Sequence, residues 1–169
     1  YSTKRGKIMS KEQAVDLNKI KTGGTFLTNV VGSEKVFCKE LFSEEEKMIY
    51  EAMRDFASNE LLPLSQNELN KKDEKLIRKL VEQMGELGFL GIDVPEKYGG
   101  SEMTKTGMCI LAEGISFCGS PSFCTVWNVQ TSIGSLGIIW YGNDEQKQKW
   151  LPGICSGEKI AAFGLTEPE

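Results

Sequence analysis

The sequence contains no histidine. This absence excludes Ser-His and Cys-His nucleophilic pairs, histidine metal sites, and the one side chain whose unperturbed pKa lies near neutrality. Any catalysis must therefore depend on a bound cofactor or on a carboxylate with a shifted pKa.

The chain also lacks a cysteine framework. Its five cysteines form no C-x-x-C motif, and an odd number cannot all be joined within one chain. They suit a reducing compartment. A zinc site needs closely spaced thiolates or imidazoles, so we expect no metal site. No apolar core of a secretory signal follows the basic N-terminal residues, and Met9 is a candidate native start.

Long apolar runs and a strong net charge are absent too. No apolar run approaches the roughly 20 residues that cross a bilayer. The 24 acidic and 20 basic residues give a net charge of −4, which does not favour nucleic-acid binding. The first 22 residues run the other way, with six basic against two acidic side chains, and we predict a solvated N-terminal arm over residues 1–40.

Two amphipathic helices are predicted in the first half of the chain. Ser43-Glu-Glu-Glu46 has the pattern of a capping box, and Pro63 ends the apolar period that follows it. A second helix begins after Asn70 or Asp73 and is closed by Gly88. Because the link between them is short and polar, we expect the two helices to pack antiparallel.

Three further helices are predicted, over residues 106–117, residues 122–141 and a short charged stretch capped by Asn143. Apolar side chains lie on most sides of 122–141, so this helix is expected to be buried all round. The charged helix should run to Trp150, because Pro152 and Gly153 would break it soon afterwards.

The glycine-rich stretch 85–100 is interpreted as a structural turn rather than a ligand loop. It has neither the lysine of a phosphate loop nor the G-x-G-x-x-G spacing. Residues 160–165 look extended and have no partner strand in this sequence. A lone strand leaves its backbone groups unpaired, so we expect its neighbours to come from residues after Glu169.

Four separated segments carry a family resemblance. These are residues 42–46, 86–100, 142–152 and 163–168, the last reading Phe-Gly-Leu-Thr-Glu-Pro. In this order they resemble the N-terminal part of an acyl-CoA dehydrogenase, over Leu41–Glu169. The lead-in Thr-Gly-Gly-Thr-Phe-Leu at 22–27, together with Glu169, is similar to the long-chain and very-long-chain branch.

The resemblance implies a mainly α fold, with an all-helical domain over 41–155 and the first strand of a truncated β-domain over 156–169. It also implies FAD as cofactor and α,β-dehydrogenation of a long-chain acyl-CoA, with electron-transfer flavoprotein as acceptor. The family commonly forms homodimers or homotetramers, in the bacterial cytoplasm or in mitochondria. Its catalytic glutamate comes from the later helical domain, so this chain is expected to hold no catalytic residue and to be inactive alone.

The same resemblance assigns binding residues. The flavin would contact the extended segment, where Gly164 permits close approach and Thr166 offers an amide and a hydroxyl. Phe163 and Leu165 would add main-chain and face contacts. The alternative from the residues alone is a buried strand followed by a turn.

Polar residues in the apolar stretch 122–141 are the predicted substrate contacts. By resemblance, Asn128, Gln130 and Thr131 line the acyl channel, while simple core packing is the alternative. Glu44, Glu45 and Glu46 are interpreted as helix caps.

Two other functions remain open on sequence grounds. Acyl-CoA oxidases and flavin monooxygenases share this N-terminal architecture. A non-enzymatic helical interaction module is a third reading, which the unpaired last strand disfavours.

Overall fold

The computed structural model describes residues 39–64, 66–69, 71 and 73–167. The chain divides into two compact units, Tyr1–Phe42 and Ser43–Glu169. Of the first unit, the described part is a short 3-10 turn, η2 (Lys39–Leu41), and Phe42. The predicted N-terminal arm therefore lies outside the described residues except for its last two.

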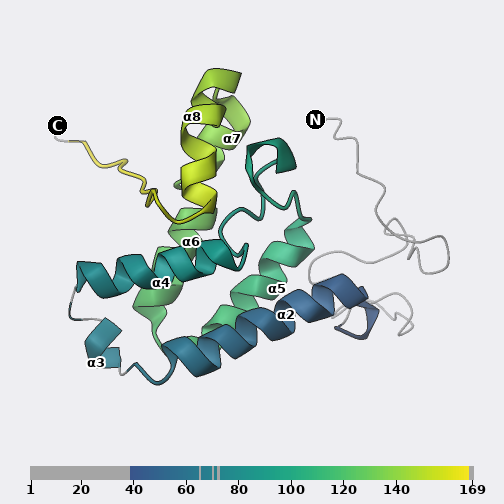
Figure 1. Cartoon of the computed structure of the whole chain (residues 1–169), viewed down its shortest axis with the longest axis vertical. Coiled ribbons are helices and arrows are strands. Elements are labelled where there is room, and N and C mark those ends of the chain that lie inside the picture. The colour runs from purple at the N-terminus through teal and green to yellow at the C-terminus, as the bar shows by residue number, and fades with distance from the viewer. Residues whose placement is uncertain (1–38, 65, 70, 72, 168–169) are drawn as a thin grey trace, which may run out of the picture. The chain divides into compact units, whose positions relative to one another are not determined.

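The second unit is built of helices, and its described residues contain no strand. The prediction of a mainly α fold is confirmed. Figure 1 shows the path of the chain. The elements in order are α2 (Glu44–Phe56), η3 (Ala57–Leu61), α3 (Gln66–Leu69), α4 (Glu74–Glu86), η4 (Glu96–Tyr98), α5 (Lys105–Ile115), η5 (Ser116–Cys118), α6 (Pro121–Thr131), α7 (Leu136–Tyr141) and α8 (Asp144–Cys155).

Local signals set the ends of α2 and α4 where the sequence predicts them. The Glu46 amide donates to Ser43 Oγ at 3.1 Å and the Ser43 amide donates to Glu46 Oε2 at 2.9 Å, which completes the capping box. Asp73 caps α4 by accepting from two backbone amides. Gly88, with φ +76°, ends the same helix in the left-handed region that glycine adopts without strain.

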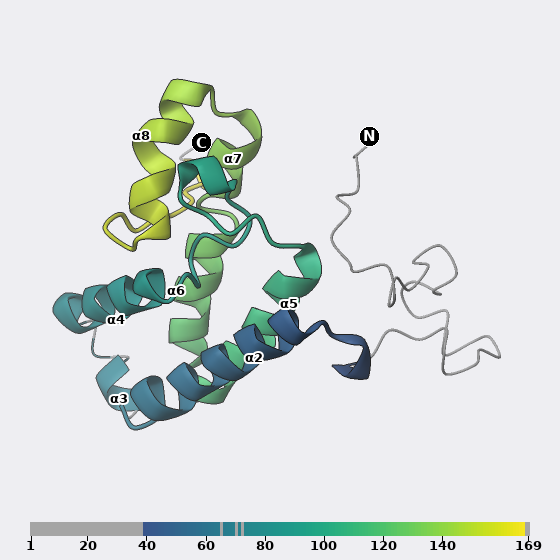
Figure 2. The ribbon, with the colours of Figure 1, turned by 45° about the vertical axis from the view of Figure 1, so that its right-hand side comes forward.

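The main core lies between α2, α4, α5 and α6. Here α2 packs most extensively along α5, as Figures 1 and 2 show. Helices α2 and α4 run in opposite directions, as predicted, and both contribute side chains to this core. Gly114 of α5 permits this approach, because a Cβ there would lie 2.8 Å from Met53 Cγ. The cluster includes the side chains of Met53, Leu61, Met84, Leu90, Ile92, Leu111, Ile115, Phe123 and Trp127, each no more than 2% exposed.

The single long helix predicted over 122–141 is wrong. It divides into α6 and α7 at a turn over residues 132–135, where Ser132 leaves the helical region with φ −125° and ψ −102°. The Gly134 amide donates to Val129 O at 2.9 Å, which closes the turn. Nor is the region buried all round, because α7 has no buried residue and Tyr141 is 81% exposed.

Helix α8 also runs further than predicted, through Pro152 to Cys155. Proline removes one amide donor but leaves its carbonyl free, and Ser156 donates to Pro152 O at 3.0 Å. Burial of Leu151 and Ile154 in a second cluster with Val94 and Tyr98 stabilises this last turn. Tertiary packing here outweighs the helix-breaking tendency of proline.

Candidate functional site

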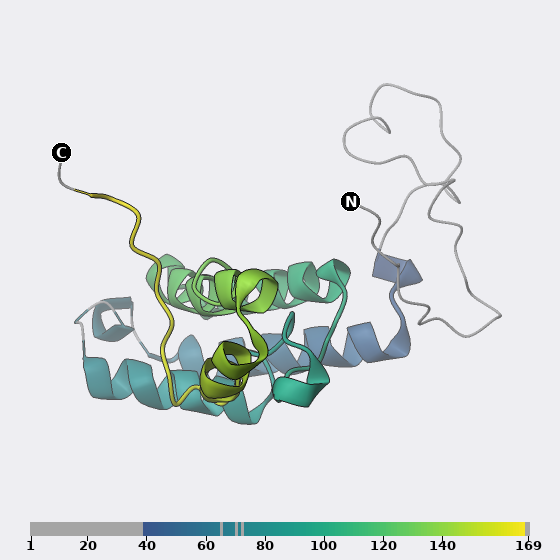
Figure 3. The ribbon, with the colours of Figure 1, turned by 90° about the horizontal axis from the view of Figure 1, so that it is seen from above.

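The terminal segment, residues 160–167, contains the predicted flavin contacts. It follows α8 and lies in neither helix nor strand. Figure 3 shows it, in yellow, leaving the helices and extending beyond them. The sequence predicts a strand here, but a strand needs a ladder of neighbours, and the described residues supply none.

One buried side chain ties the start of this segment to the helices. Gln130 of α6 is 1% exposed. Its Nε2 donates to Ile154 O at 3.0 Å and to Lys159 O at 2.8 Å, and its Oε1 accepts from the Ala161 amide at 2.7 Å. The amide of Gln130 thus joins α6, the last turn of α8 and the terminal segment.

Close packing at the turn between α6 and α7 reinforces this tie. A Cβ at Gly134 would lie 2.9 Å from Ala161 Cβ and 3.1 Å from the Ala161 carbonyl carbon. Only glycine lets the turn approach the segment so closely. The Lys159 amide also donates to Gly153 O at 2.8 Å. This bond holds the residue before the segment against the last turn of α8.

Beyond Ala161 the segment projects away from the core. Phe163 is 58% exposed and Leu165 is 76% exposed, and a Cβ at Gly164 would have no atom within 4 Å. Thr166 is exposed as well. The amides of residues 162–167 make no hydrogen bond to the described part of the chain. The segment is therefore not a buried strand, and its donors are available.

The three predicted substrate residues lie in different environments. Asn128 is exposed and borders a cavity of about 280 Å³ together with Cys124 and Trp127. Thr131 is 2% exposed, and its hydroxyl donates to Trp127 O at 3.0 Å. The side chains of Gln130 and Thr131 are hydrogen-bonded to backbone atoms. Of the three residues, Asn128 is the one whose side chain is exposed beside the cavity.

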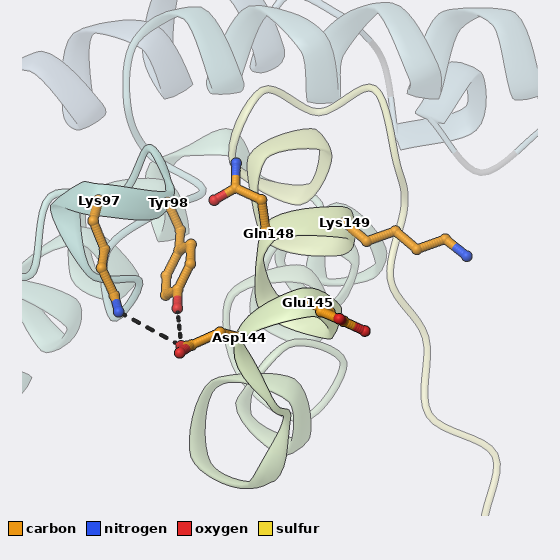
Figure 4. Close-up of a pocket in the computed structure, with 6 residues that line it drawn as sticks. All are labelled: Lys97, Tyr98, Asp144, Glu145, Gln148 and Lys149. Atoms are coloured by element: carbon orange, nitrogen blue, oxygen red, sulfur yellow. Dashed lines mark hydrogen bonds and ion pairs between the residues drawn. The ribbon is translucent and has the colours of Figure 1, made fainter.

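A hollow of about 660 Å³ lies between η4 and the start of α8. As Figure 4 shows, Lys97 and Tyr98 both point toward Asp144, whereas Glu145 and Lys149 point away from them. Tyr98 Oη donates to Asp144 Oδ1 at 2.7 Å, and Lys97 Nζ lies 3.7 Å from the same oxygen. The Tyr98 hydrogen bond, and next the Lys97 charge, lower the pKa of the Asp144 carboxyl.

Backbone hydrogen bonds hold the glycine-rich stretch 85–100 and the residues after it in a turn, as the sequence predicts. The Ser101 amide donates to Gly91 O at 2.9 Å and the Met103 amide donates to Ile92 O at 2.8 Å. A Cβ at Gly100 would lie 2.0 Å from Val94 O. The stretch therefore folds back on itself between Gly91 and Met103, and the backbone at Gly100 is packed directly against Val94.

The other acidic and thiol groups of the described residues provide no metal site. Across the described ranges, no group of three or more cysteine or acidic residues is placed to hold a metal ion. Glu44 and Glu46 lie in the first turn of α2, and Glu46 completes its capping box. No helix among these residues has the length and apolarity that a membrane span requires.

The described residues thus form an all-helical domain, followed by an extended segment, 162–167, whose backbone amides have no hydrogen-bond partner among these residues. This arrangement of helices and segment defines the class of protein. Residues 43–158 match the family described as "Acyl-CoA dehydrogenase, N-terminal domain". The chain belongs to this family.

Known proteins of the family resemble the chain over most of its length. A probable acyl-CoA dehydrogenase of Bacillus subtilis is 41% identical over 93% of this chain and 25% of its own length. The crystal structure of a Bacillus anthracis acyl-CoA dehydrogenase complexed with FAD is 42% identical, with a TM-score of 0.75, and the match covers 86% of this chain and 25% of that one.

The human mitochondrial short-chain specific acyl-CoA dehydrogenase is 36% identical over 74% of this chain and 30% of its own length. Relatives named for short-chain substrates thus occur beside those named without a chain length, and they do not single out a long-chain branch. The chain spans about a quarter to a third of the length of these relatives.

Proposed function

We propose that this chain is the helical N-terminal domain, with the first segment of the flavin-binding domain, of an FAD-dependent enzyme that introduces an α,β double bond into acyl-CoA thioesters. Helical residues 41–155 form the first part, and 156–169 begin the second. The supporting observation is the exposed segment 162–167, held at its start by Gln130 and carrying unpaired amides.

The segment has the donor chemistry that a flavin requires. Bound FAD supplies a two-electron acceptor, and its pyrimidine end becomes negatively charged on reduction. Backbone amides of Leu165 and Thr166, with the Thr166 hydroxyl, would stabilise that charge if the rest of the domain holds them toward the ring. Gly164 leaves space beside the backbone, and Phe163 offers an exposed aromatic face.

Acyl-CoA is the proposed substrate, and a long acyl chain is the proposed preference. The sequence lead-in at 22–27 and Glu169 support the long-chain branch by resemblance. Asn128, at the edge of the cavity on α6, is the proposed direct contact along the acyl channel, with Gln130 and Thr131 behind it. The base that removes the substrate proton lies outside these residues, so the chain alone should not turn over.

The whole protein is proposed to pass electrons to an electron-transfer flavoprotein and to assemble as a homodimer or homotetramer. It would work in the bacterial cytoplasm, or in mitochondria if the source is eukaryotic. These assignments follow from family membership and from the five cysteines, which suit a reducing compartment.

The experiment is to express the complete gene product and to record its visible absorption. We expect a yellow protein whose flavin absorption is bleached anaerobically by long-chain acyl-CoA more efficiently than by a short-chain thioester. A folded full-length protein that binds no FAD would exclude the proposal. Peroxide formation during turnover in air would assign the oxidase reaction instead, and preference for the short-chain thioester would exclude the long-chain assignment alone.

A further inference from the structure

We propose that Gln130 is a positioning residue for the flavin-contacting segment, acting as a substitute for a neighbouring strand at the point where the segment leaves the helices. This inference rests on the proposed function, because it assigns to Gln130 a contribution to FAD affinity. It differs from the sequence-based prediction, which places Gln130 in contact with the acyl chain.

The hydrogen-bond pattern is that of a strand neighbour. In a parallel sheet, one residue donates to the carbonyl before the residue opposite it and accepts from the amide after it. Gln130 does the same with its side chain, because Nε2 donates to Lys159 O and Oε1 accepts from the Ala161 amide, on either side of Ile160. A carboxamide offers this donor and acceptor pair in one plane, as a peptide group does.

The remaining donor of Gln130 fixes the direction of the segment relative to the helices. It reaches Ile154 O in the last turn of α8, so a single side chain connects three parts of the fold. The Gln130 side chain is 1% exposed, and its bond to Ile154 O is buried, whereas the bonds to Lys159 O and the Ala161 amide are partly buried. Loss of the side-chain amide would leave the Lys159 carbonyl and the Ala161 amide without these partners, so the start of the segment would no longer be held against α6.

The anchor lies close to the proposed flavin contacts in sequence. Ala161 is the last residue of the segment whose amide has a partner among the described residues, and Thr166 lies five positions further along the chain. A fully extended chain of that length spans at most about 17 Å. Fixing Ala161 therefore limits where the amides of Leu165 and Thr166 can lie, and it lowers the entropy lost when a ligand orders them.

The test compares three variants of the full-length holoprotein. Gln130→Leu removes all three bonds with little change in volume. Thr131→Val is the matched control, because Thr131 is equally buried but its hydrogen bonds stay within α6. We expect the FAD dissociation constant to rise on the order of tenfold in Gln130→Leu and to stay within about twofold of wild type in Thr131→Val.

Hydrogen–deuterium exchange of the FAD-free proteins gives a second measurement that needs no catalysis. Exchange over residues 161–166 should be faster in Gln130→Leu than in wild type and unchanged in Thr131→Val. An effect of Gln130→Leu on global stability alone, with FAD affinity and local exchange as in wild type, would overturn the proposal.

Gln130→Glu tests the hydrogen bonds themselves. An ionised carboxylate facing the Ile154 and Lys159 carbonyls has no donor, whereas the protonated acid regains one donor and one acceptor. Relative to wild type, FAD binding by Gln130→Glu should therefore improve as the pH falls from about 8 to about 5. If Gln130→Leu fails to fold, the pH dependence of FAD binding by Gln130→Glu decides. A ratio of its FAD dissociation constant to that of wild type that does not change with pH overturns the proposal.

Failure of this inference can be told from failure of the proposed function. A wild-type protein that folds but binds no FAD would remove both. A wild-type protein that binds FAD, with a folded Gln130→Leu variant that binds it equally tightly, would leave the proposed function standing and exclude the positioning role of Gln130.

Discussion

Tyr98 donates its phenolic hydrogen to Asp144, which lies 46 residues further along the chain, at an oxygen–oxygen distance of 2.7 Å. This bond joins the glycine-rich turn to the first residue of α8. The two residues come from two of the four segments that carry the family resemblance. The bond therefore connects two segments that are far apart in sequence, and each residue stabilises the position of the other.

Replacing Tyr98 with Phe should reduce stability in a pH-dependent manner. The folded-state pKa of Asp144 is lowered, first by the Tyr98 hydrogen bond and then by Lys97. Such a group contributes stability above its unfolded pKa of about 3.9 and loses that contribution as the pH falls through the folded pKa. Tyr98→Phe should therefore melt slightly below wild type at neutral pH, and the difference should shrink below about pH 4.

The control for this measurement is Tyr141→Phe, since Tyr141 is 81% exposed. Thermal melts followed by circular dichroism across the pH range should show no difference between this variant and wild type. A Tyr98→Phe deficit of the same size at pH 3 as at pH 7 would show that packing, not the bond to Asp144, causes the loss.

Two glycine substitutions should change stability in opposite directions. Gly100→Ala would place a Cβ 2.0 Å from Val94 O, a backbone atom that cannot move without opening the turn. We expect a loss of about 3 kcal/mol or more in the free energy of unfolding. Gly137→Ala, in α7, meets no atom within 4 Å and should stabilise the helix by up to about 1 kcal/mol. Urea denaturation measures both, and equal effects would contradict the structure.

Trp127 is the largest buried side chain of α6 and holds the turn after α4. It is 2% exposed, and its Nε1 donates to Phe89 O at 2.9 Å. Trp127→Phe would leave a cavity and remove the partner of that carbonyl, so we expect a loss of about 2–4 kcal/mol. Trp140→Phe is the matched control, because Trp140 is 61% exposed and should change stability by less than about 0.5 kcal/mol.

Features set by nearby residues were predictable from sequence, and those set by distant packing were not. The capping box of α2, the Asp73 cap of α4 and the closing Gly88 depend on residues within one or two turns. Asn143 caps α8 as predicted, with its side chain accepting from the Gln146 amide at 2.8 Å.

At the break between α6 and α7, Gly134 lies close against Ala161, a contact between residues 27 positions apart that no local pattern reveals. The passage of α8 through Pro152 depends on burial of Leu151 against the second cluster. The candidate site divides in the same way. Family motifs indicate the segment around Thr166, but the tether by Gln130 needs coordinates, although a glutamine within an apolar helix is a signal that such a residue has a specific partner.

Cysteine reactivity tests the burial of α6 and α8 directly. Burial raises the pKa of the Cys155 thiol to about 11, and burial with the neighbouring Cys118 thiol raises that of Cys124 to about 12. At pH 8 both thiols therefore stay mostly in the protonated, unreactive form. Cys109, on α5, is exposed.

In a Cys38→Ser background, iodoacetamide should modify native Cys109 first and the other three described cysteines much more slowly, as followed by intact and peptide mass spectrometry. In urea all four should be modified at similar rates, because unfolding removes the differences in accessibility between them. Equal rates at Cys109 and Cys155 in the native protein would show that the last turn of α8, which contains the Ile154 carbonyl bonded by Gln130, opens readily to solvent.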